Sequence, residues 1–275
     1  MKKVNILNVS IDNISKQELL EKLDQQGGIL MTSNVDHLIK LQKDRIFYYI
    51  YQLCNYCVCD SQIIFFASKF LGCPIKEKIS GSDFFSEFYY YNKTNQATRI
   101  FLLGAAEGVA KKAQEKINQK VGREIVVGAY SPSFGFETNK IECQKIVDMI
   151  EKSGATVLAI GVGSPKQEKW IFKYKDQLKN IKIFLPIGAT IDFEAGTKPR
   201  SPKWVSKLGL EWFYRLLSEP RRLWKRYLVD DIPFFWLLIQ QKLNLYRDPF
   251  ALRAVDVKPL KELNKIGEIN RSGFK

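Results

Sequence analysis

Polar residues that could do chemistry stand directly after short apolar runs of the sequence. Asp60 follows the run Tyr56–Cys59, and Thr32 and Asn34 close an earlier run. An aspartate in this place is commonly a helix N-cap, and Ser61 after it suits that interpretation. The alternative is a general base, because a carboxylate at the ligand edge of a sheet can accept a hydroxyl proton. On these residues alone, both interpretations stay open.

A second candidate is the glycine-containing run 161–168, which reads Gly-Val-Gly-Ser-Pro-Lys-Gln-Glu. Part of it is explained as a helix start, because Ser164 can cap and Pro165 fits the first helical position. It lacks the third glycine of a dinucleotide fingerprint and does not match a P-loop. A helix start does not require Lys166 and Gln167 together, so a polar contact to sugar or phosphate is the functional alternative.

The sequence gives little support to metal or histidine chemistry. His37 is the single histidine, and its place on a predicted helix favours packing or solvation over catalysis. A metal that bridges a diphosphate usually needs carboxylates, yet no Asp-x-Asp occurs and Asp192 with Glu194 is the nearest acidic pair. Arginines can replace the metal, since a guanidinium pairs bidentately with phosphate oxygens. We therefore expect no metal and no cofactor.

The elements that must position these residues alternate between short β-rich runs and longer amphipathic stretches. This alternation predicts an α/β, Rossmann-like fold with a largely parallel sheet and helices on both faces. The carboxyl ends of parallel strands, where Gly104 also lies, form the edge at which ligands bind. Predicted strands are Val4–Val9, Ile29–Thr32, Tyr56–Cys59, Ile100–Leu103, Ile125–Gly128, Thr156–Ile160 and Lys182–Pro186. Predicted helices are Lys16–Gln25, Asn34–Leu41, Asp44–Leu53, Gln62–Leu71, Asp83–Tyr91, Gly108–Lys120, Lys140–Lys152 and Pro165–Tyr174.

Composition and charge narrow the class of protein. The 275 residues are 45% hydrophobic and 26% charged, which is typical of a globular domain and excludes a mainly disordered chain. Five cysteines and no apparent signal peptide fit a reducing cytosol. The apolar runs are too short to cross a bilayer. The net charge of +14 indicates a polyanionic partner: nucleic acid, an anionic membrane or a phosphorylated substrate.

Much of the positive charge lies near the C-terminus. Residues 198–227 hold nine cations and two anions, interleaved with tryptophans and tyrosines, and the apolar run 233–239 follows. We expect residues 1–197 to be an α/β catalytic core and 198–246 a basic-aromatic helical appendage that docks on a membrane and completes the active site. Residues 247–275 are predicted to be a polar tail. Within the appendage, Phe234, Phe235 and Trp236 are expected to contact the membrane.

In their order along the chain, these motifs resemble the WecG/TagA/CpsF family of bacterial glycosyltransferases over residues 1 to about 230. The matching stretches are Thr32-Ser-Asn34, Cys59-Asp60-Ser61, Gly72-Cys-Pro74, Lys78-Ile-Ser-Gly81-Ser-Asp83, Phe101-Leu-Leu-Gly104, Gly161 to Glu168, Ile187 to Gly196, Arg200-Ser-Pro202, Gly209 to Arg215, Glu219 to Arg222 and Arg226-Tyr227. Three positions depart from the family pattern, with Ser61 and Ala105 in place of glycines and Lys78 in place of an arginine. The lysine loses bidentate phosphate geometry.

The resemblance implies an inverting transfer of an N-acetylhexosamine, such as N-acetylmannosamine, from a UDP-sugar to polyprenyl-diphosphate-linked GlcNAc. Such a reaction serves cell-surface polysaccharide or teichoic acid synthesis at the cytoplasmic face of the cell membrane, where the protein would be peripheral. The catalytic base would be Asp60. Substrate-binding residues would be Thr32, Asn34, Lys78, Gly104, Lys166, Gln167, Gly188 and Asp192. Diphosphate-binding cations would be Arg215, Arg221, Arg222, Lys225 and Arg226.

Other functions stay open at this stage. A related enzyme could transfer glucose or a uronic acid for exopolysaccharide, and composition does not distinguish these donors. Basic residues interleaved with aromatics also describe nucleic-acid binders, but here the charge is concentrated behind an α/β core, so no nucleic-acid partner is expected. A non-catalytic membrane-surface protein is a third alternative, which the retained Asp60, Asn34 and Gln167 disfavour. A homo-oligomer is left open.

Overall fold

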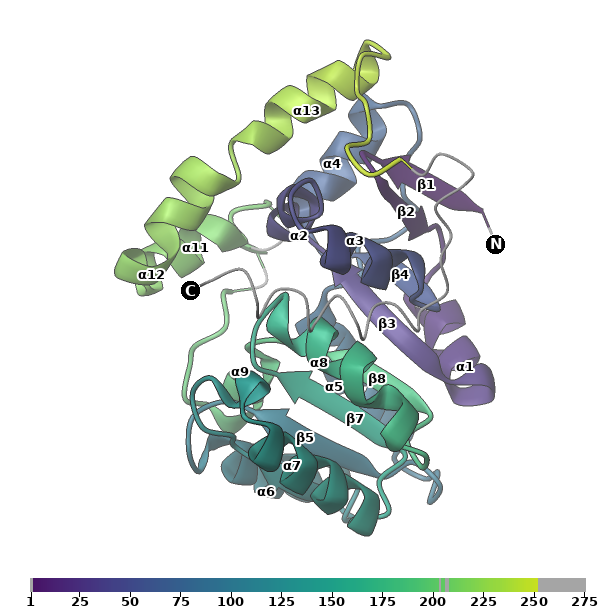
Figure 1. Ribbon diagram of the computed structural model, residues 1–275, viewed down its shortest axis with the longest axis vertical. Helices are drawn as coiled ribbons and strands as arrows, with labels where there is room; N and C mark the ends of the chain where they lie inside the picture. Colours follow the sequence, from purple (N-terminus) through teal and green to yellow (C-terminus); the bar gives the residue numbers. More distant parts are fainter. Residues whose placement is uncertain (1, 203, 206–207, 252–275) are drawn as a thin grey trace.

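A six-stranded, all-parallel sheet forms the centre of the computed structural model, which describes residues 2–202, 204–205 and 208–251. The order of the strands across the sheet is β4-β3-β8-β7-β5-β6 (Figure 1). Their bounds are β3 Gly28–Ser33, β4 Tyr56–Cys59, β5 Ile100–Gly104, β6 Val126–Tyr130, β7 Val157–Gly161 and β8 Ile183–Pro186. The predicted α/β fold with a parallel sheet is confirmed.

Helices cover both faces of this sheet, which explains why the strands are apolar without alternation. One face packs against α1 Lys16–Gln26, α5 Gly81–Tyr91, α6 Val109–Val121 and α9 Thr190–Ala195. The other packs against α2 Val35–Lys40, α3 Arg45–Gln52, α7 Lys140–Lys152 and α8 Lys166–Tyr174, and α4 Gln62–Phe70 adds to the same core. The sequence pattern did not predict α9, which has only six residues.

The first predicted strand, Val4–Val9, is wrong. The segment folds as an antiparallel hairpin of β1 Lys3–Ile6 and β2 Val9–Asp12, separate from the main sheet. Leu7 has a φ of 52°, so the chain reverses within a run that looks continuously apolar. A left-handed leucine is uncommon, and the residue types therefore did not signal the turn.

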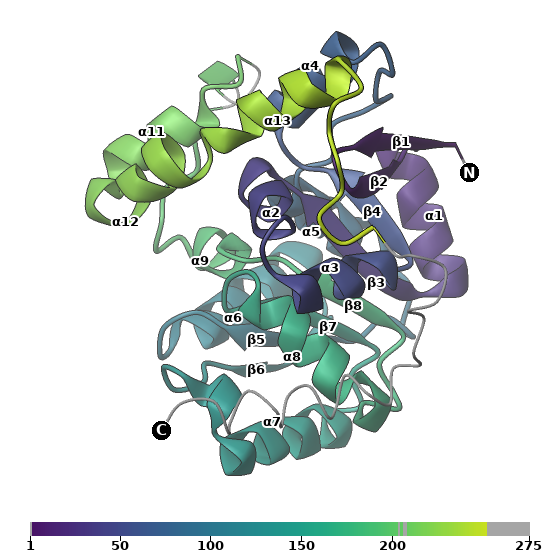
Figure 2. The same ribbon diagram turned by 45° about the horizontal axis from the view of Figure 1, so that its top comes forward.

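The C-terminal segment forms α11 Glu211–Ser218, α12 Pro220–Lys225, a π-helical turn Arg226–Asp230 and α13 Pro233–Lys242. These helices lie beside the sheet layers, and α13 returns toward the N-terminal hairpin (Figures 1 and 2). The Gln241 side chain accepts a hydrogen bond from the Leu7 N–H (2.7 Å) and donates one to the Asn5 carbonyl (3.0 Å).

Burial along α13 corrects one expectation about the membrane. Phe234 is fully buried in the core, so it does not face a membrane, whereas Phe235 and Trp236 are exposed. Beyond α13, the Tyr48 hydroxyl donates to Asp248 (2.9 Å), within the segment predicted as a polar tail. Residues 252–275 of that tail lie outside the described residues.

Candidate active site

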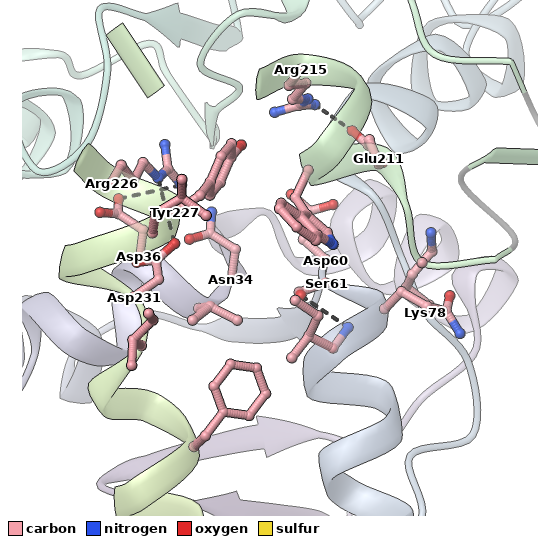
Figure 3. Close-up of a pocket in the computed structure, with 18 residues that line it drawn as sticks. Asn34, Asp36, Asp60, Ser61, Lys78, Glu211, Arg215, Arg226, Tyr227 and Asp231 are labelled. Atoms are coloured by element: carbon pink, nitrogen blue, oxygen red, sulfur yellow. Dashed lines mark hydrogen bonds and ion pairs between the residues drawn. The ribbon is translucent and has the colours of Figure 1, made fainter. Parts of the chain in front are cut away.

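A cavity of about 490 Å³ lies where the carboxyl ends of β3 and β4 meet the C-terminal helices. Asn34 and Asp60 follow those two strands, and Arg215 and Tyr227 reach the cavity from α11 and the π-helical turn. Figure 3 shows Asp60 in the middle of the lining residues, between Asn34 and Lys78. The charged residues that line the cavity are Asp36, Asp60, Lys78, Glu211, Arg215, Arg226 and Asp231.

The structure rejects the N-cap interpretation of Asp60. The cap of α4 is Ser61, whose hydroxyl accepts from the N–H groups of Ile63 (3.2 Å) and Ile64 (3.5 Å). The Asp60 carboxylate instead accepts a hydrogen bond from the Gly81 N–H (3.3 Å) and faces the cavity. The carboxylate therefore does not cap α4; it accepts from the first N–H of α5 and is placed to contact a ligand in the cavity.

The surroundings of Asp60 raise its pKa to about 6. Burial is the largest cause, because the charged form loses hydration, and the nearby Glu211 carboxylate adds to it. Arg215 and Lys78 oppose the rise by stabilising the carboxylate. At neutral pH the group is mostly ionised yet holds a proton more readily than an exposed aspartate, which suits a general base.

Two arginines in the wall of the cavity are held by carboxylates. Arg215 forms an ion pair with Glu211 at 2.5 Å, one helical turn away. Arg226 lies 3.5 Å from Asp36 and 4.0 Å from Asp231, and its buried Nε has no hydrogen-bond partner within the described part of the chain. Such long contacts leave guanidinium donors available for an anionic ligand.

Asp36 also connects the cavity to the turn after β7. Its Oδ2 atom accepts from Lys40 Nζ (2.7 Å), and the same ammonium donates to the Ser164 carbonyl (3.0 Å). Burial raises the pKa of Asp231 to about 6, and Asp36 adds to this rise while Arg226 opposes it. Ion pairs therefore join α2 to the π-helical turn, and the hydrogen bond from Lys40 links them to Ser164.

Residues 32–37 divide between the cavity and the protein interior. Asn34 lines the cavity, and its side-chain oxygen caps α2 by accepting from the His37 N–H (3.0 Å). Thr32 lies outside the cavity lining and packs against Gly81. A Cβ added to Gly81 would come within 3.1 Å of the Thr32 hydroxyl oxygen. His37 is buried and hydrogen-bonded to Tyr51 (2.5 Å), and burial lowers its pKa to about 3, so it stays neutral.

Gly104 and Gly188 lie farther along the same sheet edge. A Cβ on Gly104 would be 2.4 Å from the Gly161 carbonyl oxygen, and one on Gly161 would be 2.3 Å from the Gly188 oxygen. The three backbones therefore approach too closely for any side chain. After β5 the chain continues to β6 on one side of the sheet, and after β7 it continues to β8 on the other side. In parallel sheets, ligands bind in the crevice between two such strands.

The predicted polar contacts of the segment 161–168 are engaged within the protein. Lys166 pairs with Glu137 (2.6 Å) and lies 5.1 Å from the Phe134 ring centroid. The Gln167 side chain accepts from the Gly163 N–H (3.3 Å) and donates to Glu168 (2.9 Å). Glu168 is fully buried, and burial raises its pKa to about 6. The Gln167 side chain thus stabilises the turn between β7 and α8 through these two hydrogen bonds.

The remaining predicted residues lie outside the cavity lining. Asp192 stands in the first turn of α9, on the neighbouring part of the sheet edge. Arg222 is exposed and paired with Glu219 (2.7 Å) on α12. Arg221 and Lys225 are exposed on the same helix. Of the five cations predicted for a diphosphate, Arg215 and Arg226 therefore reach the cavity.

Three acidic lining residues were not among the residues predicted from sequence: Asp36, Glu211 and Asp231. Glu211 and Arg215 stand four residues apart in the appendage predicted to be helical. This spacing pairs opposite charges on a helix and could have drawn attention to the glutamate. Asp36 and Asp231 are nearly 200 residues apart in sequence, and no local pattern signals that both face Arg226.

Comparison with known proteins places this arrangement in a family. The model of the glycosyl transferase WecG/TagA/CpsF family matches residues 4–248, and the chain belongs to this family. A Bacillus subtilis (strain 168) relative is 29% identical over 239 residues, which cover 86% of this chain and 89% of the relative. One from Staphylococcus aureus (strain MRSA252) is 26% identical over 244 residues, covering 85% and 90%. Both relatives are named N-acetylglucosaminyldiphosphoundecaprenol N-acetyl-beta-D-mannosaminyltransferase.

Proposed function

We propose that this protein transfers N-acetylmannosamine, or a related hexosamine, from a UDP-sugar to a polyprenyl-diphosphate-linked GlcNAc. The names of the two relatives support the transferred sugar and the acceptor, since each relative aligns over most of its length. The observation that carries the proposal is the Asp60 carboxylate, which faces a cavity that also presents Arg215 and Arg226. A proton acceptor and cations near one another are what a glycosyl transfer from a diphosphate requires.

The proposed reaction is a single inverting displacement. Asp60 accepts the proton of the acceptor hydroxyl as its oxygen bonds to the anomeric carbon of the donor sugar. The bond from that carbon to the β-phosphate oxygen breaks at the same time, and UDP leaves with the electron pair. The acceptor occupies the cavity, and the donor lies against the adjoining edge with Gly104 and Gly188. Backbone N–H groups at such turns suit phosphate oxygens.

We propose that the cations of this chain, and no divalent metal, neutralise the diphosphates. Lys78, Arg215 and Arg226 line the cavity, and a guanidinium offers two parallel donors to a phosphate. Asp36, Asp231 and Glu211 hold the two arginines in place until a ligand arrives.

The protein is proposed to work at the inner face of the cell membrane, because a polyprenyl acceptor is anchored there. In the described part of the chain, no helix has the length and apolar character needed to span a bilayer. The exposed aromatic residues of α13, Phe235 and Trp236, suit the interface between headgroups and hydrocarbon. Membrane contact would therefore be peripheral.

The direct test is a donor screen with a water-soluble alkyl-diphosphate–GlcNAc acceptor, in which UDP release and the anomer of the product are measured. We expect UDP-N-acetylmannosamine to be used and the product to have the inverted configuration. Transfer of glucose or a uronic acid instead would favour the exopolysaccharide alternative. Retention of configuration would remove Asp60 from its proposed role.

A further inference from the structure

Two helices, α4 and α13, contribute apolar residues to the lining of the cavity. Ile63 of α4, Phe235 of α13 and Ile232 just before α13 are among the residues that line the cavity. Both helices lie near each other at the same end of the molecule in both views (Figures 1 and 2). Lys242 Nζ at the end of α13 lies 5.5 Å from the Phe70 ring centroid, which confirms that the helices stay close beyond the cavity.

The same two helices also expose large apolar side chains to solvent. Phe66 and Phe70 of α4 are each 51% exposed and stand one helical turn apart, so they share a face. Phe235 and Ile239 of α13 have the same spacing and are 51% and 43% exposed. We name the surface formed by Ile63, Phe66, Phe70, Ile232, Phe235 and Ile239 the apolar strip.

The charges around the apolar strip suit a lipid. The sequences of α4 and α13 contain no aspartate or glutamate, and their cations, Lys69 and Lys242, stand in the last turn of each helix. Cations at the outer end of an apolar surface match anionic headgroups above hydrocarbon. Several exposed apolar side chains on two neighbouring helices mark an interaction site rather than ordinary surface.

We propose that the apolar strip holds the first isoprene units of the acceptor's polyprenyl chain and leads the rest of it from the cavity to the bilayer. This rests on the proposed function, because it assumes that the acceptor diphosphate lies near Arg226. From Ile63 to Phe70, α4 rises by about 10 Å, which gives the chain a path along the core domain. Lipid recognition thus involves α4 as well as the basic segment 198–246.

The test compares the wild-type protein with the double variant Phe66→Ser, Phe70→Ser, in binding of geranyl diphosphate and geranylgeranyl diphosphate. Both phenylalanines are half exposed, so the variant should fold, and a thermal melt checks this. For the wild-type protein we expect the longer chain to bind more tightly. In the variant the affinity for the longer chain should fall about tenfold, equal to about 1.4 kcal/mol, with little change for the shorter one.

A matched control is the double variant Ile141→Ser, Tyr91→Ser, which removes exposed apolar side chains on α7 and α5. It should bind both prenyl diphosphates as the wild-type protein does. Equal losses for both chain lengths, or none for either, in the Phe66 and Phe70 variant would overturn the inference. Because binding is measured without a donor sugar, this result is separate from the transfer assay that tests the proposed function.

Discussion

Replacing Asp60 by asparagine should abolish most activity while making the protein more stable. The asparagine keeps the size of the side chain and an oxygen for the Gly81 N–H, but it does not accept the proton. Turnover should fall by roughly 10²–10⁴, the usual contribution of a general base. In the wild-type enzyme, kcat/KM should be constant near neutral pH and fall by half at about pH 6, where the carboxylate becomes protonated.

The gain in stability follows from the raised pKa. The folded protein holds the Asp60 proton up to about pH 6, whereas the ordinary value is 3.8, so the folded state binds more protons between these values. Stability therefore falls as pH rises through this window, by at most about 3 kcal/mol. Asp60 is only partly buried, so solvent screens part of this cost. We expect Asp60→Asn to raise the free energy of unfolding by about 1–3 kcal/mol near pH 7.

Urea unfolding of both proteins near pH 7 and near pH 4 measures this effect, and the difference should vanish at the lower pH. Asp176→Asn is a matched control, because the Asp176 side chain is 87% exposed and lies on the surface. It should change neither stability nor turnover. An Asp60→Asn protein that keeps near-wild-type turnover, or that is less stable near pH 7, would refute this account of the site.

Three further predictions concern the charges around the cavity. Arg215→Lys should lower kcat about tenfold because a lysine lacks the guanidinium fork, while exposed Arg222→Lys should change it little; equal effects in a steady-state assay would contradict the cavity assignment. Asp36→Asn should raise the KM for the acceptor several-fold and lower the melting temperature, because Lys40 and Arg226 lose a shared carboxylate. Asp36→Glu should restore part of the acceptor affinity and part of the thermal stability. An unchanged KM in the asparagine variant would count against a positioning role. Excess EDTA should leave transfer intact, and a loss that magnesium or manganese restores would show that the metal-free proposal is wrong.

Local sequence patterns determined the fold class and the place of Asp60. Apolar runs such as Ile100–Leu103 alternate with amphipathic stretches, and buried parallel strands require this pattern because both faces are covered. A polar residue after such a run lies at the carboxyl edge of the sheet, so the sequence alone identifies Asp60 as a candidate for catalysis. The helix cap beside it was ambiguous, because Asp60 and Ser61 both suit that position.

Only the tertiary structure decided which charged residues meet. Asp36 and Arg226 lie 190 residues apart, and their contact arises because α13 returns to the N-terminal hairpin and carries the π-helical turn with it. The same return buries Phe234 while Phe235 stays exposed. Helical periodicity tells which residues share a face, but not what covers that face. That depends on long-range packing, which a local pattern of residue types does not encode.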